Sequence, residues 1–377
     1  MPLIHLETLE AFKARATGQV GFEGCLLQGL DLRSENEELL NANVQGAVFL
    51  GCKLHQGVVL HLVAGGATVF PDLGKARPYH PTRSKLYTLN ELMKGFEAHV
   101  VDSFEQSADI AIYNHFQGFR RDKHPPILET LAQRLHDHAI DDALSGVLAE
   151  NGGRRVVGVM GGHALKRNDV LFREVARIGW SLAQKGYFVA TGGGPGAMEA
   201  ANLGAWMSCY DEHDLLAAVD ILAAEPDYRK HEYLLLGYEV LDRYPNGAES
   251  LAVPTWFYGH EPSNQFSSHI AKYFSNSLRE DGLLAIATHG VVYAPGSAGT
   301  IQEVFMDAAQ NHYGTFHHVS PMVFLGDDEW TVQRPVLPLL RALAADRQYS
   351  HMIGNASSAE GVVRFIQEHP PVEYKQA

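Results

Sequence analysis

The chain has 377 residues, of which 46% are hydrophobic and 20% are charged. These proportions are ordinary for a folded globular protein, and the length corresponds to about two or three domains. With 30 Lys and Arg against 44 Asp and Glu, the formal charge is −14. This charge excludes nucleic acid and anionic membranes as expected partners, because both are polyanions. A small anion held by backbone amides stays compatible with it.

The cysteines and the first residues indicate a cytoplasmic protein. Cys25, Cys52 and Cys209 are too few for a disulfide framework, which favours a reducing compartment. We expect Cys209 to be a buried small residue. The opening residues, MPLIHLETLE, lack the basic and apolar regions of a signal peptide. The uncharged stretch Leu54–Pro71 is broken by Gly, Gln and His, so it does not predict a membrane helix.

Residues 1–150 are predicted to form an N-terminal extension. A loose five-residue rhythm over 19–57 (GFEGCLLQGLDL, then NANVQGAVFLGCKL) predicts a pentapeptide-like β-ladder, which we extend over 19–70. Residues 54–70 are expected to be strands separated by glycines. Residues 88–148 are predicted to be helical, with Thr88 and Glu91 as a capping box. The NGG at 151–153 is the predicted boundary.

Residues 151–377 alternate between strand and helix patterns and predict a second domain. Leu171, Val175, Ile178 and Leu182 lie on one helix face. Strands are expected at 155–162, 187–194, 250–259, 290–296, 321–326 and 351–356, and further helices at 197–207, 301–313, 335–346 and 359–369. Residues 211–247 are predicted to be an inserted helical segment. Such alternation predicts an α/β fold with a doubly wound parallel sheet and helices on both faces.

Three glycine-rich turns follow predicted strands of this second domain. They contain Gly161 and Gly162, then Gly192, Gly193, Gly194 and Gly196, then Gly296, Ser297, Gly299 and Thr300. Ligands of open α/β sheets bind at the carboxyl ends of the strands, and glycine lets backbone amides approach a ligand closely. The second and third turns open into helices, whose first amides favour phosphate. Each turn alone is also explained as a tight turn, but together they predict a phosphate site that is neither a P-loop nor a dinucleotide fingerprint.

Two charged residues near the third turn are candidate catalytic groups. Thr300 and Glu303 fit a capping box, which would make Glu303 purely structural. Alternatively, Glu303 faces the sugar of a bound nucleotide, where a carboxylate stabilises a developing oxocarbenium ion. Arg279 precedes Pro295 by 16 residues. It is either a solvated helix arginine or a guanidinium that reaches the phosphate or the leaving base.

The segments VATGGGPGAMEAANLGA and APGSAGTIQE resemble the signatures GGGxxGLM and PGGxGTxxE of the LOG (Lonely guy) family. The resemblance covers about residues 150–370, and the longer bacterial nucleotide nucleosidases of this family also carry an N-terminal extension. It implies a Rossmann-like domain that hydrolyses nucleoside 5′-monophosphates to free base and ribose 5-phosphate, although many members were once labelled lysine decarboxylases. It further implies Glu303 and Arg279 as catalytic residues, Met198 among the nucleotide-binding residues, a homodimer or higher oligomer, and no cofactor.

The sequence departs from the family pattern at two positions and leaves alternatives open. Ser297 replaces the second glycine of PGG, and the family's Arg position falls on Glu280, one residue from Arg279. No metal is expected, because the histidines lack ligand spacing. Lys185 and Lys272 are predicted in helices away from the glycine turns, which disfavours a pyridoxal phosphate lysine. A non-catalytic carrier of a nucleotide or of molybdenum cofactor on the same fold is the alternative function. The preferred base and the role of residues 1–150 stay open.

Overall fold

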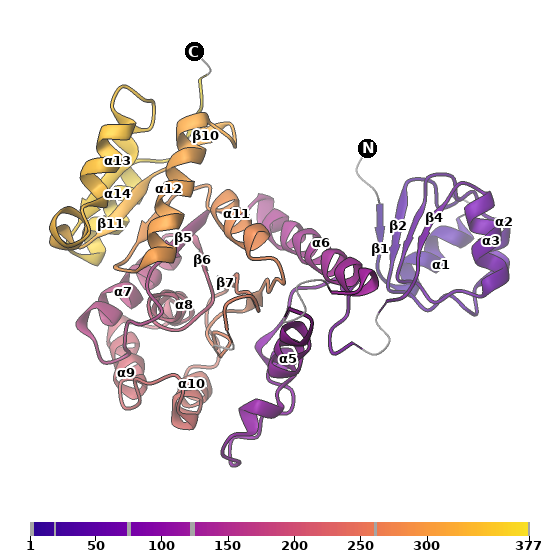
Figure 1. Cartoon of the computed structure of the whole chain (residues 1–377), viewed down its shortest axis with the longest axis horizontal. Coiled ribbons are helices and arrows are strands. Elements are labelled where there is room, and N and C mark those ends of the chain that lie inside the picture. Colours follow the sequence, from indigo (N-terminus) through magenta and orange to yellow (C-terminus); the bar gives the residue numbers. More distant parts are fainter. Residues whose placement is uncertain (1–3, 19, 74–76, 121–124, 260–261, 376–377) are drawn as a thin grey trace. The chain divides into compact units, whose positions relative to one another are not determined.

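The computed structural model describes residues 4–18, 20–73, 77–120, 125–259 and 262–375. Contacts between residues group the chain into two compact units. The first contains residues 1–86 and 114–147, and the second contains residues 87–113 and 148–377. The predicted division at residue 150 stays a prediction, and residues 87–113 pack with the second unit. Each unit is described by itself (Figure 1).

The first unit contains a four-stranded parallel sheet whose strands follow chain order, β1-β2-β3-β4. Its elements are β1 (Ile4–Leu6), α1 (Leu9–Thr17), β2 (Cys25–Gln28), α2 (Asn36–Asn41), β3 (Val48–Leu50), α3 (Gln56–Ala64) and β4 (Thr68–Phe70). A helix therefore separates each strand from the next. The pentapeptide-like ladder predicted for 19–57 is wrong, because the strands recur once per strand–helix pair and not every five residues.

Helix α3 corrects a second expectation, since its sequence QGVVLHLVA was predicted as strand. Val58 and Leu62 are the buried residues of α3, and their spacing of four places both on one helix face. This face contributes to a core that includes Phe12, Leu27, Leu39, Phe49 and Leu62, all fully buried. Burial of that face against the sheet outweighs the strand preference of the Val-Val pair.

The stretch predicted to be helical, 88–148, contains among its described residues three α-helices, with turns over 93–102 between the first two. It contains α4 (Leu89–Leu92), α5 (Ala108–Arg120) and α6 (Ile127–Ala149), with short 3₁₀ turns at Ser103–Gln106 and Glu150–Gly152. Thr88 caps α4, and its hydroxyl accepts a hydrogen bond from the amide of Glu91 at 3.2 Å. The predicted helix start at Thr88 is therefore confirmed.

The second unit contains a seven-stranded sheet in which every pairing is parallel, in the order β12-β11-β9-β5-β6-β7-β8. The strands are β5 (Val156–Met160), β6 (Phe188–Thr191), β7 (Leu251–Ala252), β8 (His269–Ile270), β9 (Val291–Tyr293), β11 (Met322–Leu325) and β12 (Ile353–Ala356). A separate antiparallel pair joins β10 (His318–Val319) to β13 (Val372–Glu373). The predicted α/β class with a parallel sheet is confirmed, although β8 was not expected.

Helices cover this sheet in two layers (Figure 1). One layer contains α7 (Val170–Gln184), α8 (Ala197–Met207) and α14 (Ala359–Glu368), in which α7 contacts both others. The other contains α11 (Asn276–Ile286), α12 (Ala298–Tyr313) and α13 (Val336–Ala344), in which α12 contacts both others. The predicted insertion forms α9 (Glu212–Leu222) and α10 (His231–Arg243).

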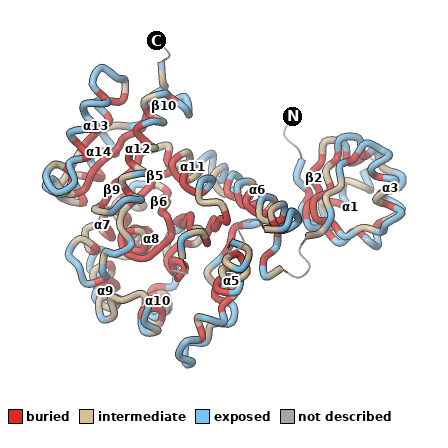
Figure 2. Tube along the Cα trace, in the orientation of Figure 1, coloured by how far each residue is buried: buried red, intermediate tan, exposed pale blue. Residues whose placement is uncertain are grey.

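The core of this unit explains why its strands are continuous apolar runs. Every residue of β5, β6, β9 and β11 is buried (Figure 2). Strands covered on both faces need apolar side chains on both. Helices α7 and α8 pack closely because Gly179 lies against the backbone of Ala201 and Gly204 lies against that of Ala176.

Cys209 is exposed, so the expectation that it is buried is wrong. It follows the last turn of α8, where the chain has already left the core.

Among the described residues, the helices are all too short or too polar to span a lipid bilayer.

Candidate functional site

A cavity of the second unit lies beyond the carboxyl ends of β5, β6, β7 and β9. It has a volume of about 550 Å³. Strands β5 and β9 are neighbours, and the strand order runs outward from them in opposite directions. Such a switch point is where open α/β sheets bind ligands. A cavity of this size accommodates a ligand as large as a nucleotide.

The structure brings most of the predicted site residues together at this cavity. Its lining includes Gly161, Gly162, Gly192, Gly193, Gly194, Met198, Arg279, Ser297, Gly299, Thr300 and Glu303. Gly196 and Gly296 are not among the lining residues. Gly196 has φ +74°, and a Cβ there would lie 2.5 Å from the carbonyl oxygen of Gly162. It therefore allows the first two glycine turns to pack against each other, whereas Gly296 packs against the side chain of Thr300.

A buried polar network holds the second glycine turn in place. The hydroxyl of Thr191 accepts a hydrogen bond from the amide of Gly193 at 3.0 Å and donates to Oδ1 of Asn202 at 2.6 Å. Nδ2 of Asn264 donates to the same Oδ1 at 2.9 Å. Gly193 has φ +76°, and a Cβ there would lie 2.9 Å from Cδ of Pro254. A residue larger than glycine would therefore strain the backbone at position 193, and these hydrogen bonds hold the turn in place.

The third turn presents open amides to the cavity. Helix α12 begins at Ala298, and Ser297 is its N-cap, without a side-chain capping bond. The hydrogen bond from the amide of Ile301 to the carbonyl of Ser297, at 3.0 Å, closes the first turn. The amides of Ala298, Gly299 and Thr300 therefore precede the first intrahelical bond and are available to an anion.

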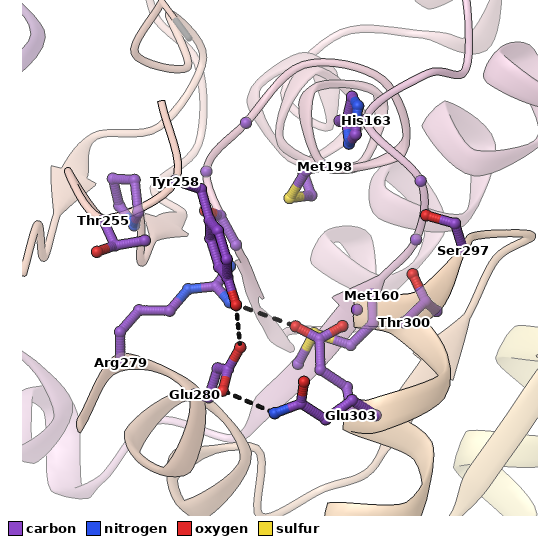
Figure 3. A pocket seen from close by; sticks show the side chains of 18 of the residues that line it. Met160, His163, Met198, Thr255, Tyr258, Arg279, Glu280, Ser297, Thr300 and Glu303 are labelled. Atoms are coloured by element: carbon purple, nitrogen blue, oxygen red, sulfur yellow. Dashed lines mark hydrogen bonds and ion pairs between the residues drawn. The ribbon is translucent and has the colours of Figure 1, made fainter. Parts of the chain in front are cut away.

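This geometry corrects the capping-box alternative for Glu303. Because the helix begins two residues earlier than Thr300, Glu303 lies in the second turn and cannot cap the helix start. Its side chain is 12% exposed and points into the cavity toward Arg279 (Figure 3). The Glu303 side chain is therefore free of a local structural role in the helix terminus.

Arg279 is buried, so it is not the solvated helix arginine considered above. Its Nε donates to the carbonyl of Val253 at 2.8 Å, and Nη2 donates to the carbonyl of Gly192 at 3.3 Å. Its Nη1 lies 3.4 Å from Oε1 of Glu303. The guanidinium thus connects the ends of β6 and β7 to helix α12. A Cβ at Gly192 would collide with Nη2 of this guanidinium, so a residue larger than glycine does not fit there.

The pKa of Glu303 is raised above its ordinary value of 4.5. Burial is the main cause, and the nearby carboxylate of Glu280 adds to it. The Arg279 guanidinium opposes the shift through its charge and its hydrogen bond. Low dielectric surroundings disfavour the charged carboxylate, so Arg279 is the group that favours its ionised form.

Three residues on the side of the cavity nearest Arg279, namely Tyr258, Glu280 and Gln302, were not predicted from the sequence to have a role. Oε2 of Glu280 accepts a hydrogen bond from Nε2 of Gln302 at 2.9 Å, and the hydroxyl of Tyr258 lies 3.4 Å from its Oε1 (Figure 3). Tyr258 follows β7 and is 69% exposed. The only sequence signal was the position of Glu280 beside Arg279, one helical position along α11.

A buried ion pair forms another part of the wall and corrects the expectation for Lys272. Lys272 follows β8, lines the cavity and donates to both carboxylate oxygens of Asp109, at 2.7 and 2.8 Å. Trp256 Nε1 and the hydroxyl of Ser263 also donate to Asp109, at 2.7 and 2.9 Å. Asp109 lies 163 residues before Lys272 in the chain, so no local pattern could have predicted this pairing.

Candidate metal ligands lie elsewhere. Among the described residues, Asp211, His213 and Asp214 could approach a shared ion at the start of α9. Oδ1 of Asp211 already accepts a hydrogen bond from the amide of Asp214 at 2.9 Å, which caps the helix. These residues do not line the cavity. The cavity itself combines open amides, one arginine and two carboxylates, which suits an anionic ligand with hydroxyl groups.

Comparisons with known proteins gave one family model and several solved structures. A family model described as the SLOG cluster4 family matches residues 154–208. This span contains the first two glycine turns and ends before Arg279 and Glu303. A search of curated proteins gave no match.

Several solved structures match part of the chain at low sequence identity. The molybdenum cofactor binding protein from Rippkaea orientalis is 16% identical, covers 57% of this chain and 96% of its own, and has a TM-score of 0.36. The molybdenum cofactor carrier protein from Chlamydomonas reinhardtii is 15% identical, with 57% and 97% coverage and a TM-score of 0.35. The protein TM1055 is 19% identical, with 57% and 99% coverage and a TM-score of 0.36.

Proposed function

We propose that the cavity binds a nucleoside 5′-monophosphate and hydrolyses its N-glycosidic bond to give free base and ribose 5-phosphate. The observation that supports this most is one largely buried carboxylate, Glu303, located one turn beyond the open amides of α12 and 3.4 Å from Arg279. A phosphate at the helix start brings the attached ribose toward that carboxylate. The resemblance of the glycine turns and of the GTIQE segment to the LOG family supports the same reaction.

The phosphate is held by the amides of Ala298, Gly299 and Thr300, together with the hydroxyls of Ser297 and Thr300. The partial positive charge of the α12 N-terminus favours a dianion there. Backbone amides carry no net charge, so the formal charge of −14 does not oppose this local binding. Phosphate binding thereby orients the sugar in the cavity.

The ionised carboxylate of Glu303 binds ribose hydroxyls and stabilises the positive charge that develops at the sugar ring. The oxygen of a water molecule bonds to C1′ as the C1′–N bond breaks. The electron pair of that bond leaves with the base, and the base takes up a proton released by the water. A preorganised charge in a buried site is more effective than the same charge in water. Arg279 keeps Glu303 ionised and oriented.

The experiment that tests this proposal is the substitution Glu303→Gln, which keeps the size of the side chain and removes its charge. We expect kcat for nucleotide hydrolysis to fall by about 100-fold or more, while the Kd for nucleotide, measured by calorimetry, changes only several-fold. Glu368→Gln, at an exposed position of α14 outside the cavity, is the matched control and should behave as wild type.

Two results would contradict the proposal. If Glu303→Gln keeps more than a tenth of wild-type kcat, Glu303 does not provide the catalytic charge. If the wild-type chain binds nucleotides but hydrolyses none, the cavity belongs to a carrier or binding protein. The same titrations therefore separate the enzyme from its non-catalytic alternative.

A further inference from the structure

Glu280 is a second carboxylate in the cavity, and the reaction proposed above does not use it. It lies on α11 beside Arg279, yet only 8% of its surface is exposed. Among the described residues, no lysine, arginine or histidine forms an ion pair with it, whereas Arg279 pairs with Glu303. A buried carboxylate without a cation retains a strong capacity to accept hydrogen bonds.

The hydrogen bonds of Glu280 leave part of this capacity open. A carboxylate offers about four acceptor positions. Gln302 occupies one, at 2.9 Å, and the hydroxyl of Tyr258 lies at the long distance of 3.4 Å. Gln302 fixes the orientation of the group, because its amide comes from the neighbouring helix α12. A ligand donor can therefore add to Glu280 without displacing its strongest partner.

Tyr258 places an aromatic ring beside this carboxylate. The ring is exposed and lines the cavity, and its hydroxyl accepts a hydrogen bond from Nδ2 of Asn276 at 3.0 Å. Such a ring offers an apolar face on which a planar nucleobase stacks. In Figure 3, Ser297 and Thr300 lie on one side of Glu303, and Tyr258 and Glu280 lie on the other.

We propose that Glu280 selects nucleotides whose base carries an exocyclic amino group. This inference rests on the proposed function, because it places the phosphate at α12 and the ribose at Glu303. The base then extends toward Tyr258 and Glu280. An ionised carboxylate accepts hydrogen bonds from an amino group and repels a carbonyl oxygen at the same position. Adenine and cytosine are therefore accepted in preference to hypoxanthine and uracil.

The test compares two pairs of substrates that differ chiefly in this group, AMP with IMP and CMP with UMP. For the wild-type chain we expect kcat/KM to favour the amino member of each pair by about tenfold, the effect of one charge-assisted hydrogen bond. Glu280→Gln presents both a donor and an acceptor, so both ratios should approach one. Asp281→Asn, an exposed neighbour on the same helix, removes the same charge and should leave both ratios unchanged.

A second variant guards against misfolding of the first. Gln302 is exposed, so Gln302→Ala should fold normally while releasing Glu280 from its fixed orientation. We expect this variant, like Glu280→Gln, to bring the AMP/IMP and CMP/UMP ratios of kcat/KM closer to one. Equal turnover of both members of each pair by wild type would overturn the inference. So would a uniform loss of kcat/KM for all four nucleotides in Glu280→Gln, which would place the carboxylate at the sugar.

Binding separates this inference from the proposed function. The Kd of each of the four nucleotides is measured by calorimetry for the wild type and Glu280→Gln. If no nucleotide is hydrolysed, the proposed function fails, but a wild-type preference in Kd that Glu280→Gln abolishes would still support the role of Glu280. If all four bind equally to both proteins, the inference is overturned whether or not hydrolysis occurs.

Discussion

At the scale of single residues, Arg279 connects three parts of the site. It bonds to the carbonyls of Val253 and Gly192 and pairs with Glu303. Its planar guanidinium carries several donors in fixed directions, which lysine cannot reproduce. The position of Glu303 and its charge therefore both depend on this one side chain. Charge repulsion from Glu280 raises the pKa of Glu303, whereas Arg279 lowers it.

The pH dependence of activity tests this balance. The pKa of Glu303 is raised above 4.5 by burial and by Glu280, and Arg279 opposes the shift. The proposed mechanism uses the ionised form of Glu303, so kcat/KM should fall as the pH drops through this raised pKa. The acidic midpoint should thus lie above pH 4.5, and Glu280→Gln should move it to lower pH. A midpoint that Glu280→Gln leaves in place would contradict this electrostatic account.

Asp307 gives a separate pH effect, on stability. Burial raises its pKa to about 7, and a hydrogen bond from the hydroxyl of Tyr293, at 2.8 Å, opposes the shift. The folded protein thus retains a proton that the unfolded chain loses above about pH 4. Stability should therefore fall as the pH rises from about 4 to 7 and then level off.

The variant Asp307→Asn has no titrating group at this position, so its stability should not show this fall as the pH rises. Urea unfolding at pH 5 and pH 8 measures the effect. Between these values the free energy of unfolding of wild type should decrease relative to the variant, by an amount on the order of a few kcal/mol. A difference between the two proteins that stays constant with pH would show that Asp307 ionises normally in the folded state.

At the scale of elements, the first two glycine turns form one packed unit. A Cβ at Gly196 would lie 2.5 Å from the carbonyl oxygen of Gly162 and 2.8 Å from that of His163, at φ +74°. The variant Gly196→Ala should therefore separate the turns and weaken binding of ribose 5-phosphate by about tenfold or more. Calorimetric titration with ribose 5-phosphate measures this directly.

Gly282 provides the matched control for that variant. It lies in α11, where a Cβ would contact nothing within 4 Å. The variant Gly282→Ala should leave ribose 5-phosphate binding unchanged and stabilise the helix by about 0.5–1 kcal/mol. Equal binding by both alanine variants would mean that the packing of the turns does not shape the site.

Elements with strong local signals were predictable from the sequence, and elements that depend on distant contacts were not. The apolar strands that end in glycines, and the helix face of Leu171, Val175, Ile178 and Leu182, are encoded within short windows. Helix α3 was predicted as a strand because its short apolar run fits both the helical period of 3.6 residues and the buried-strand pattern. Glu303 was predicted from its motif, whereas the choice between capping and non-capping positions depends on where α12 starts, which the structure shows.

The ion pair in the wall of the cavity could not be predicted from the sequence either. Lys272 was assigned to a helix away from the glycine turns, yet it lines the cavity and pairs with Asp109. The two residues come from segments that the sequence assigned to different domains. A pairing over this distance in the chain leaves no periodic trace, so only the folded structure reveals it.

At the scale of the whole molecule, the second unit includes a segment from the N-terminal part of the chain. Tyr87 exchanges backbone hydrogen bonds with Ile270, at 2.9 and 3.0 Å, and so extends the sheet beyond β8. Asp109 neutralises the buried ammonium of Lys272. A chain cut at residue 150, as composition suggests, would lose both contacts.

We therefore expect a chain of residues 150–377 to be much less stable than a chain of residues 87–377. Removing one partner of a buried ion pair costs about 3–5 kcal/mol, because the remaining charge is left unpaired. Thermal unfolding and limited proteolysis of both chains, beside the full-length protein, measure the difference. Equal melting temperatures for the two shortened chains would show that residues 87–113 add nothing to the stability of the second unit.

We propose that the protein cleaves the N-glycosidic bond of nucleoside 5′-monophosphates in this cavity. The most direct test incubates the purified full-length chain with AMP, CMP, GMP, IMP and UMP and measures free base and ribose 5-phosphate together. We predict equal amounts of the two products from at least one nucleotide, without release of inorganic phosphate. Intact nucleotides throughout, or phosphate release in place of base release, would contradict it.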